Sequence, residues 1–101
     1  MKEWVNNMTV ELHFDGFRVD TVPEVAKDFW KEMTDFTNQT YYVGEVLNGD
    51  YNYVAGYQGQ ALPATLGYPN FFKLRDIFKS QNQASMWSLR NHFQAMKAFP
   101  D

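Results

Sequence analysis

Alternating apolar and polar positions mark the first regular element of the chain. Within residues 14–20, Phe17 and Val19 share one face, whereas Arg18 and Asp20 share the other. A period of two is typical of a β-strand with one buried face. The pattern therefore predicts a strand that ends at Asp20.

A helix is expected directly after this strand. Thr21 stands three residues before Glu24, which is the spacing of a capping box, and Pro23 is tolerated in a first helical turn. The residues Asn38 and Gln39 are expected to end the helix. Apolar residues recur at helical spacing between these limits and predict a buried stripe of Val25, Phe29, Met33 and Phe36.

The rest of the chain predicts two more strands and two more helices. Residues 41–46 are rich in aromatic and β-branched side chains and stop at a turn-forming sequence, 48–50, so they read as a second strand. The stretch from Gly49 to Pro63 is expected to be a loop, and residues 64–68 a short third strand. Two amphipathic helices follow, the second of them starting at Ser85. Their predicted apolar stripes are Phe71, Leu74 and Phe78, and Met86, Leu89, Phe93 and Met96.

The order of these elements predicts an α/β fold. A strand–helix–strand unit almost always crosses over right-handed, so the first two strands should be parallel, and such strands are often adjacent. A parallel sheet of about three strands leaves two open edges, and parallel sheets normally have both faces covered. The pattern indicates a piece of something larger.

Composition and charge exclude several classes of protein. A hydrophobic content of 45% is too high for a disordered chain, and 101 residues suit one unit or part of one. A net charge of −3 with scattered basic residues argues against a nucleic-acid partner, and no apolar run is long enough to span a membrane. The chain has no cysteine, so thiolate chemistry is excluded. Asn7 and Asn38 each begin an N-glycosylation pattern, which slightly favours secretion.

Two acidic residues lie where the first two predicted strands end. Ligands of α/β sheets bind at the carboxyl ends of the strands, and both Asp20 and Glu45 lie at such an end. Strands about 4.8 Å apart would place the two carboxyl groups near the roughly 5–5.5 Å typical of retaining glycosidases. Arg18 should favour an ionised Asp20, whereas Glu45 has no basic neighbour in its own strand and is expected to keep its proton longer. Acidic residues at strand ends also cap helices or pair with basic residues, so a structural role for Asp20 and Glu45 stays open beside a catalytic one.

Other residues allow a functional and a structural reading. The histidines, His13 and His92, fit no metal spacing and are expected on the surface or in helices. Asp50 could bind a cation or complete a turn. Three tyrosines of the predicted loop could stack on sugar rings or pack the loop down: Tyr51, Tyr53 and Tyr57.

Two strings of residues carry a family resemblance. Residues 15–22, Asp-Gly-Phe-Arg-Val-Asp-Thr-Val, resemble the strand-four signature of the α-amylase family of glycoside hydrolases. Residues 44–50, Gly-Glu-Val-Leu-Asn-Gly-Asp, resemble its strand-five signature, and fungal or protist-like secreted amylases are the nearest look-alikes. The resemblance implies that residues 1–101 are a fragment of a catalytic barrel domain, a partial (β/α)8 TIM barrel. The chain would begin in the helix before strand four and carry strands four to six with their helices.

The resemblance also implies roles for individual residues. Asp20 matches the nucleophile, Glu45 the general acid/base and Arg18 the arginine that supports the nucleophile. The substrate would be an α-1,4-linked glucan such as starch, and the protein would be secreted. Sugar contacts are implied at Glu24, Asn48 and Gly49, and a calcium contact through the backbone carbonyl of Glu24.

Some parts of the family pattern are missing. Where many relatives carry Lys-His, this chain has Pro23 and Glu24, and it has no Asn-His-Asp string for a third catalytic carboxylate. Most calcium ligands would therefore lie outside the chain, and the partner of this fragment would be the rest of the barrel. The chain alone is expected to be inactive. The alternative is a non-catalytic sugar-binding or structural partial barrel.

Overall fold

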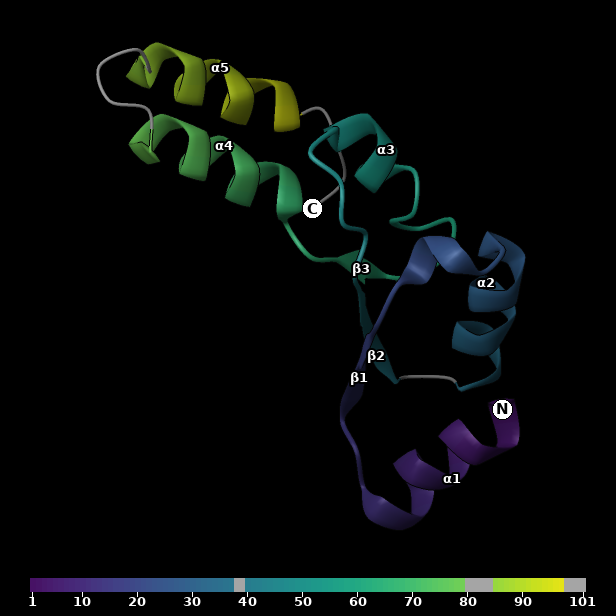
Figure 1. Ribbon diagram of the computed structural model, residues 1–101. Coiled ribbons are helices and arrows are strands. Elements are labelled where there is room, and N and C mark those ends of the chain that lie inside the picture. Colours follow the sequence, from purple (N-terminus) through teal and green to yellow (C-terminus); the bar gives the residue numbers. More distant parts are fainter. Residues whose placement is uncertain (38–39, 80–84, 98–101) are drawn as a thin grey trace.

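The computed structural model describes residues 1–37, 40–79 and 85–97, so the predicted helix end at Asn38 and Gln39 lies outside the described residues. Helices, strands and one 3-10 turn, η1, alternate along the chain (Figure 1). In order they are α1 (Lys2–Leu12), β1 (Gly16–Val19), η1 (Val22–Glu24), α2 (Lys27–Phe36), β2 (Tyr41–Gly44), α3 (Tyr51–Ala55), β3 (Ala64–Thr65), α4 (Tyr68–Lys79) and α5 (Met86–Met96). The chain thus opens with a helix before its first strand, as predicted.

The strands form one parallel sheet in the order β1-β2-β3, which confirms the predicted α/β fold and the adjacency of the first two strands. Gly16 pairs with Tyr41 and Val19 with Gly44, so the next residues in register are Asp20 and Glu45. Figure 1 shows α2 beside the sheet and the α4–α5 pair extending away from it. The molecule is elongated, 53 × 23 × 22 Å. The numbering of the strands as four to six remains a prediction.

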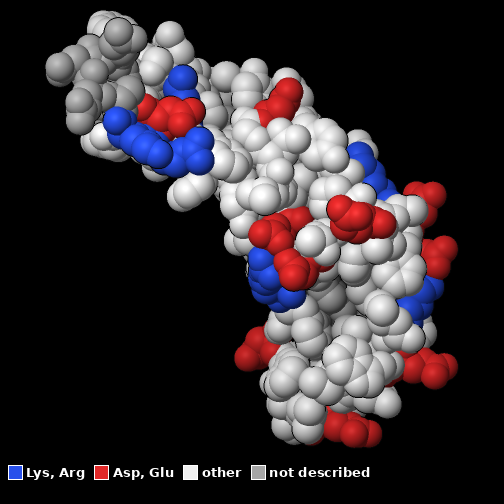
Figure 2. Space-filling model, in the orientation of Figure 1, with Lys and Arg blue, Asp and Glu red and all other residues white. Residues whose placement is uncertain are grey.

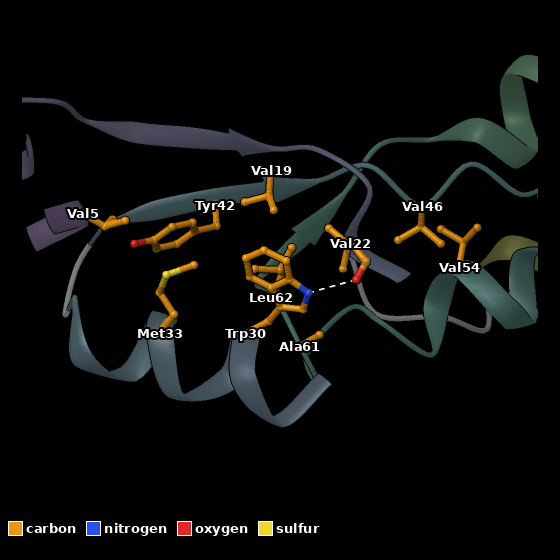
Figure 3. Packing of buried hydrophobic residues seen from close by; sticks show 10 residues of the cluster. All are labelled: Val5, Val19, Val22, Trp30, Met33, Tyr42, Val46, Val54, Ala61 and Leu62. Carbon is orange, nitrogen blue, oxygen red and sulfur yellow. Dashed lines mark hydrogen bonds between the residues drawn. The ribbon is translucent and has the colours of Figure 1, made fainter. Parts of the chain in front are cut away.

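The main hydrophobic core lies between the sheet and α2. Val19 and Tyr42 point from β1 and β2 toward Trp30 and Met33 of α2 (Figure 3). Burying each such side chain contributes about 1.5–3 kcal/mol. The buried polar groups are also paired, because the Trp30 Nε1 donates to the Val22 carbonyl oxygen at 2.9 Å. This core holds the first two strands in place beneath the candidate site.

The predicted start of the second helix is wrong. Thr21 adopts a left-handed conformation, φ 46°, and its side chain makes no capping hydrogen bond. Val22 is fully buried and its amide donates to the Glu45 carbonyl oxygen at 3.1 Å. The segment forms only a 3-10 turn, because the backbone is already extended at Val25, φ −126° and ψ 147°. The helix α2 begins later, at Lys27.

The buried face of α2 therefore differs from the predicted stripe. Met33 is buried and Phe29 packs against the core, but Val25 is 39% and Phe36 50% exposed. Trp30, which the prediction left out, is buried. The inward face runs through residues 30, 33 and 37, which follow helical spacing from the later start.

The segment predicted as a loop, 49–63, contains the short helix α3. The Asp50 carboxylate caps it by accepting from the amides of Asn52 at 2.8 Å and Tyr53 at 3.2 Å. A helix of five residues is too short to show an apolar period, so only the cap signals it in sequence. The third strand is also shorter than predicted, and Tyr68 is the first residue of α4 instead of the last of the strand.

The last two helices form where predicted, but their apolar stripes are not buried in this chain. The Ser85 hydroxyl caps α5 as expected, accepting from the Trp87 amide at 3.1 Å. Phe71 is 55% and Phe78 75% exposed, and α5 contributes no buried residue. The two helices cover each other only in part, and α3 adds a further contact with α4. No helix in the described part of the chain is long and apolar enough to cross a membrane.

Candidate active site

The ends of β1 and β2 bring Asp20 and Glu45 together, as the parallel pairing predicted. The Glu45 amide donates to the Val19 carbonyl oxygen at 2.8 Å, and the Glu45 carbonyl oxygen accepts from the Val22 amide. The backbone of Glu45 is thereby held on both sides. Its side chain is 15% exposed, whereas that of Asp20 is 69% exposed.

Arg18 joins the two carboxylates. Its Nη1 lies 2.9 Å from Asp20 Oδ1, and its Nη2 lies 3.0 Å from Glu45 Oε2. Figure 2 shows acidic groups beside a basic group near the middle of this face, with mostly uncharged surface around them. The predicted pairing of Arg18 with Asp20 is confirmed. Glu45 has no basic neighbour in its own strand, but the Arg18 guanidinium reaches it from the adjacent strand.

Tyr68 is a site residue that the sequence analysis did not single out. Its hydroxyl donates to Glu45 Oε1 at 2.7 Å, while the Thr21 amide lies 3.5 Å from Oε2. Tyr68 follows β3, and β3 pairs in parallel with β2. Its place after the third strand of a parallel sheet, at the same edge as the two acids, is the signal that could have found it.

These contacts stabilise the ionised form of Glu45. A hydrogen bond with the Asp20 carboxyl and another from Tyr68 lower the pKa of Glu45 from 4.5 to about 2. The Thr21 amide and the Arg18 charge act in the same direction and outweigh partial burial, which raises it. The prediction that Glu45 keeps its proton longer is therefore wrong for this chain. The same hydrogen bond raises the pKa of Tyr68 above its usual 10.0.

The other predicted sugar contacts lie around this edge of the sheet. Glu24 is exposed at the end of η1. The Asn48 side chain accepts from the Asp50 amide at 2.8 Å and so shapes the turn before α3. A Cβ at Gly49 would meet the Phe72 ring at 3.5 Å, so this glycine lies against α4. Contacts of Glu24, Asn48 and Gly49 with sugar remain predictions.

Metal-binding side chains are not clustered in the described residues. They hold no group of three or more His, Cys, Asp or Glu side chains that could bind an ion, so the Glu24 carbonyl would be at most a single calcium ligand. Asp50 caps α3, which supports its structural reading. The Tyr57 ring packs against the core and beneath Lys27, whose Nζ lies 4.5 Å from the ring centroid. His92 pairs with Asn70 at 2.9 Å, and burial together with the Lys73 charge lowers its pKa.

Known proteins that this chain resembles in sequence include amylases. No family model matches the chain. Over all 101 residues it is 31% identical to the Beta/alpha-amylase of Paenibacillus polymyxa, of which it spans 8%. Over 78 residues, or 77% of the chain, it is 35% identical to Alpha-amylase 1 of Lipomyces kononenkoae, of which it spans 12%.

Solved structures give the same result. An α-amylase from Malbranchea cinnamomea superposes on 99% of this chain with a TM-score of 0.86 and 30% identity, and the match covers 21% of that protein. The α-amylase of Geobacillus thermoleovorans, solved with acarbose, matches 99% of the chain with a TM-score of 0.80 and 27% identity, over 23% of its own length.

Proposed function

Because the chain belongs to the α-amylase family, as an internal segment of its barrel domain, we propose that it supplies two catalytic carboxylates for hydrolysis of α-1,4-glucosidic bonds in starch-like glucans. The observation that carries the proposal is the bridge from one guanidinium, Arg18, to Asp20 and Glu45 on adjacent parallel strands. Two carboxyl groups held next to each other fit a retaining mechanism, which leaves no room for a water between them.

In this mechanism Asp20 attacks the anomeric carbon while Glu45 donates a proton to the departing glycosidic oxygen. The bond between carbon and oxygen breaks, and the sugar becomes an ester of Asp20. Water then attacks the same carbon, Glu45 takes its proton, and the ester bond breaks to release the sugar. Arg18, whose Nη1 lies 2.9 Å from Asp20 Oδ1, orients the nucleophile for its attack.

The acid step requires a proton on Glu45, whose pKa of about 2 in this chain leaves it ionised near neutral pH. Burial raises this pKa, so covering the site with the remaining barrel and with sugar would return the proton to Glu45. The 101-residue chain lacks that cover. This is a physical reason to expect no activity from the chain alone.

The remaining roles complete the proposal. Glu24, Asn48 and Gly49 would contact the sugar from the loops beyond the strands. The protein would be secreted, as suits an enzyme that acts on extracellular glucan. Calcium, if bound, would take only the Glu24 carbonyl from the described residues, and no step above depends on it.

Glu45→Gln in a complete barrel tests the acid role. The exchange keeps volume and polarity but removes the proton, so starch turnover should fall by at least about 100-fold, since general acid catalysis contributes 10²–10⁴-fold. Glu11→Gln, which makes the same change at an exposed position on α1, should leave turnover unchanged. Turnover near wild type in Glu45→Gln would move the acid role to another residue.

Asp20→Asn tests the nucleophile and separates catalysis from the alternative, a sugar-binding or structural partial barrel. A trapping fluorosugar should label Asp20 in the parent protein, and mass spectrometry should find no label in the variant. A parent barrel that binds starch oligomers, releases no reducing sugar and takes no label would favour the non-catalytic alternative.

A further inference from the structure

The two oxygens of the Glu45 carboxylate have different surroundings. Oε2 faces the Arg18 guanidinium at 3.0 Å and, at longer range, the Thr21 amide. Oε1 accepts from the Tyr68 hydroxyl at 2.7 Å. Asp20 also hydrogen-bonds with this carboxyl group. A guanidinium can only donate, whereas a tyrosine hydroxyl can donate or accept.

This difference determines which oxygen can carry a proton. A proton on Oε2 would face the permanently charged Arg18, which has no atom to accept it. A proton on Oε1 can be matched by rotation of the Tyr68 hydroxyl, which then accepts instead of donating. Oε1 is therefore the oxygen that exchanges the proton.

We infer that Tyr68 is a positioning residue that holds Oε1 of Glu45 and sets how readily this oxygen takes and gives its proton. The inference rests on the proposed acid/base role of Glu45. It adds a residue from the third strand's end to a site otherwise built on the first two.

The surrounding structure fixes Tyr68 in this place. The Leu66 amide donates to the Gly44 carbonyl oxygen at 2.9 Å, and the Tyr68 amide donates to the Leu66 carbonyl oxygen at 2.8 Å. The backbone leading to Tyr68 is thus tied to the residue just before Glu45. The Tyr68 ring also lies against that of Phe72, with centroids 6.1 Å apart. Loss of the hydroxyl alone should leave this packing intact.

The charged and titratable groups that contact the Glu45 carboxyl come from two directions. Arg18 and Asp20 approach from the end of β1, and Tyr68 approaches from the start of α4. Because the Tyr68 hydroxyl is uncharged, its removal changes hydrogen bonding without changing net charge near the site. A change in the titration of Glu45 can then be assigned to the hydroxyl.

The test uses Tyr68→Phe in a complete barrel, with Tyr41→Phe as the matched control. Tyr41 is exposed at the opposite end of β2, so it loses the same atom away from the site. Glutamate labelled with ¹³C would be titrated by NMR, with the Glu45 signal assigned by its loss in Glu45→Gln. Turnover would be measured across pH in parallel.

Tyr68→Phe should move the Glu45 titration and the basic limb of the kcat/KM profile to higher pH, because a donor to the ionised form is lost. It should lower kcat roughly tenfold, a fraction of the 10²–10⁴-fold of acid–base catalysis, with KM within about twofold. Tyr41→Phe should do neither. An unchanged Glu45 titration in Tyr68→Phe would overturn the inference. A shifted titration in a barrel without hydrolysis would sustain it and refute the proposed function instead.

Discussion

Replacing Gly44 should show how tightly the core is packed beneath the active site. It pairs with Val19 in the sheet, precedes Glu45 and is buried. A Cβ placed there would lie 2.4 Å from Leu62 Cδ1 and 2.9 Å from Val22 Cγ2. The glycine therefore allows both side chains to close over β2.

The cost of Gly44→Ala follows from these two contacts. Both distances lie well below the roughly 3.5–4.0 Å at which carbon atoms pack favourably. Leu62 is 1% and Val22 0% exposed, so neither can turn into solvent. Overpacking of a core costs about 1–3 kcal/mol, and two rigid neighbours place this variant toward the upper end.

The effect should reach the active site as well as the core. The Val22 amide donates to the Glu45 carbonyl oxygen, so a displaced Val22 moves the backbone that carries the acid. Catalysis depends on placement within about 0.5 Å. Gly44→Ala in a complete barrel should therefore lose turnover together with stability.

The assay is urea unfolding of a complete barrel followed by tryptophan fluorescence, since Trp30 lies in the same core. Gly67→Ala is the matched control, because its added Cβ would meet only the Asn70 amide at an ordinary 3.5 Å. We expect the control to stay within about 0.5 kcal/mol of wild type. Equal free energies of unfolding for the two variants would refute the packing of Leu62 and Val22 against this strand.

Three further predictions address the fragment, its acid and its caps. The 101-residue chain alone should release no reducing sugar above background. Because apolar side chains such as Phe71 and Trp87 are exposed, its side chains should be loosely packed and give no near-ultraviolet circular dichroism. Hydrolysis by the chain alone that Asp20→Asn abolishes would contradict this. In this chain the pKa of Glu45 is lowered from 4.5 to about 2, so its contribution to stability is present above pH about 4.5 and is lost as pH falls toward 2. Burial by the other strands of a complete barrel opposes this shift and should narrow the pH range of the loss. Unfolding followed against pH should show a smaller acid loss in Glu45→Gln, and an identical acid loss would argue against the pairing. Asp50→Ala should destabilise a complete barrel by about 1 kcal/mol through loss of the α3 cap, with Asp50→Asn, which retains an acceptor oxygen, losing less in the same urea assay.

The lowered pKa of Glu45 bears on whether this residue can act as an acid in the isolated chain. The contacts that orient the carboxylate are the same ones that keep it ionised. A working acid then needs burial by sugar or by neighbouring barrel strands to restore its proton. The fragment therefore carries the carboxylates in position without the surroundings that give one of them its acid role.

Local pattern and short strings were sufficient for the parallel sheet and for three of the site's residues, Arg18, Asp20 and Glu45. The period of two through Phe17 and Val19 and the strand–helix–strand order predict that β1 and β2 are parallel and favour their being neighbours, which the sheet order β1-β2-β3 confirms. Asp20 and Glu45 follow these strands directly, so they must meet at the same edge. Such features depend on residues that are neighbours in the sequence, so they can be predicted without a structure.

Only the tertiary structure decided what surrounds these residues. Tyr68 reaches Glu45 from beyond β3, 23 positions along the chain, and Arg18 reaches it from another strand. The 3-10 turn at Val22 lies against the end of β2, where the Val22 amide donates to the Glu45 carbonyl oxygen. These contacts join side chains and backbone that are distant in sequence, and their combined effect on proton affinity depends on distances that no local pattern contains.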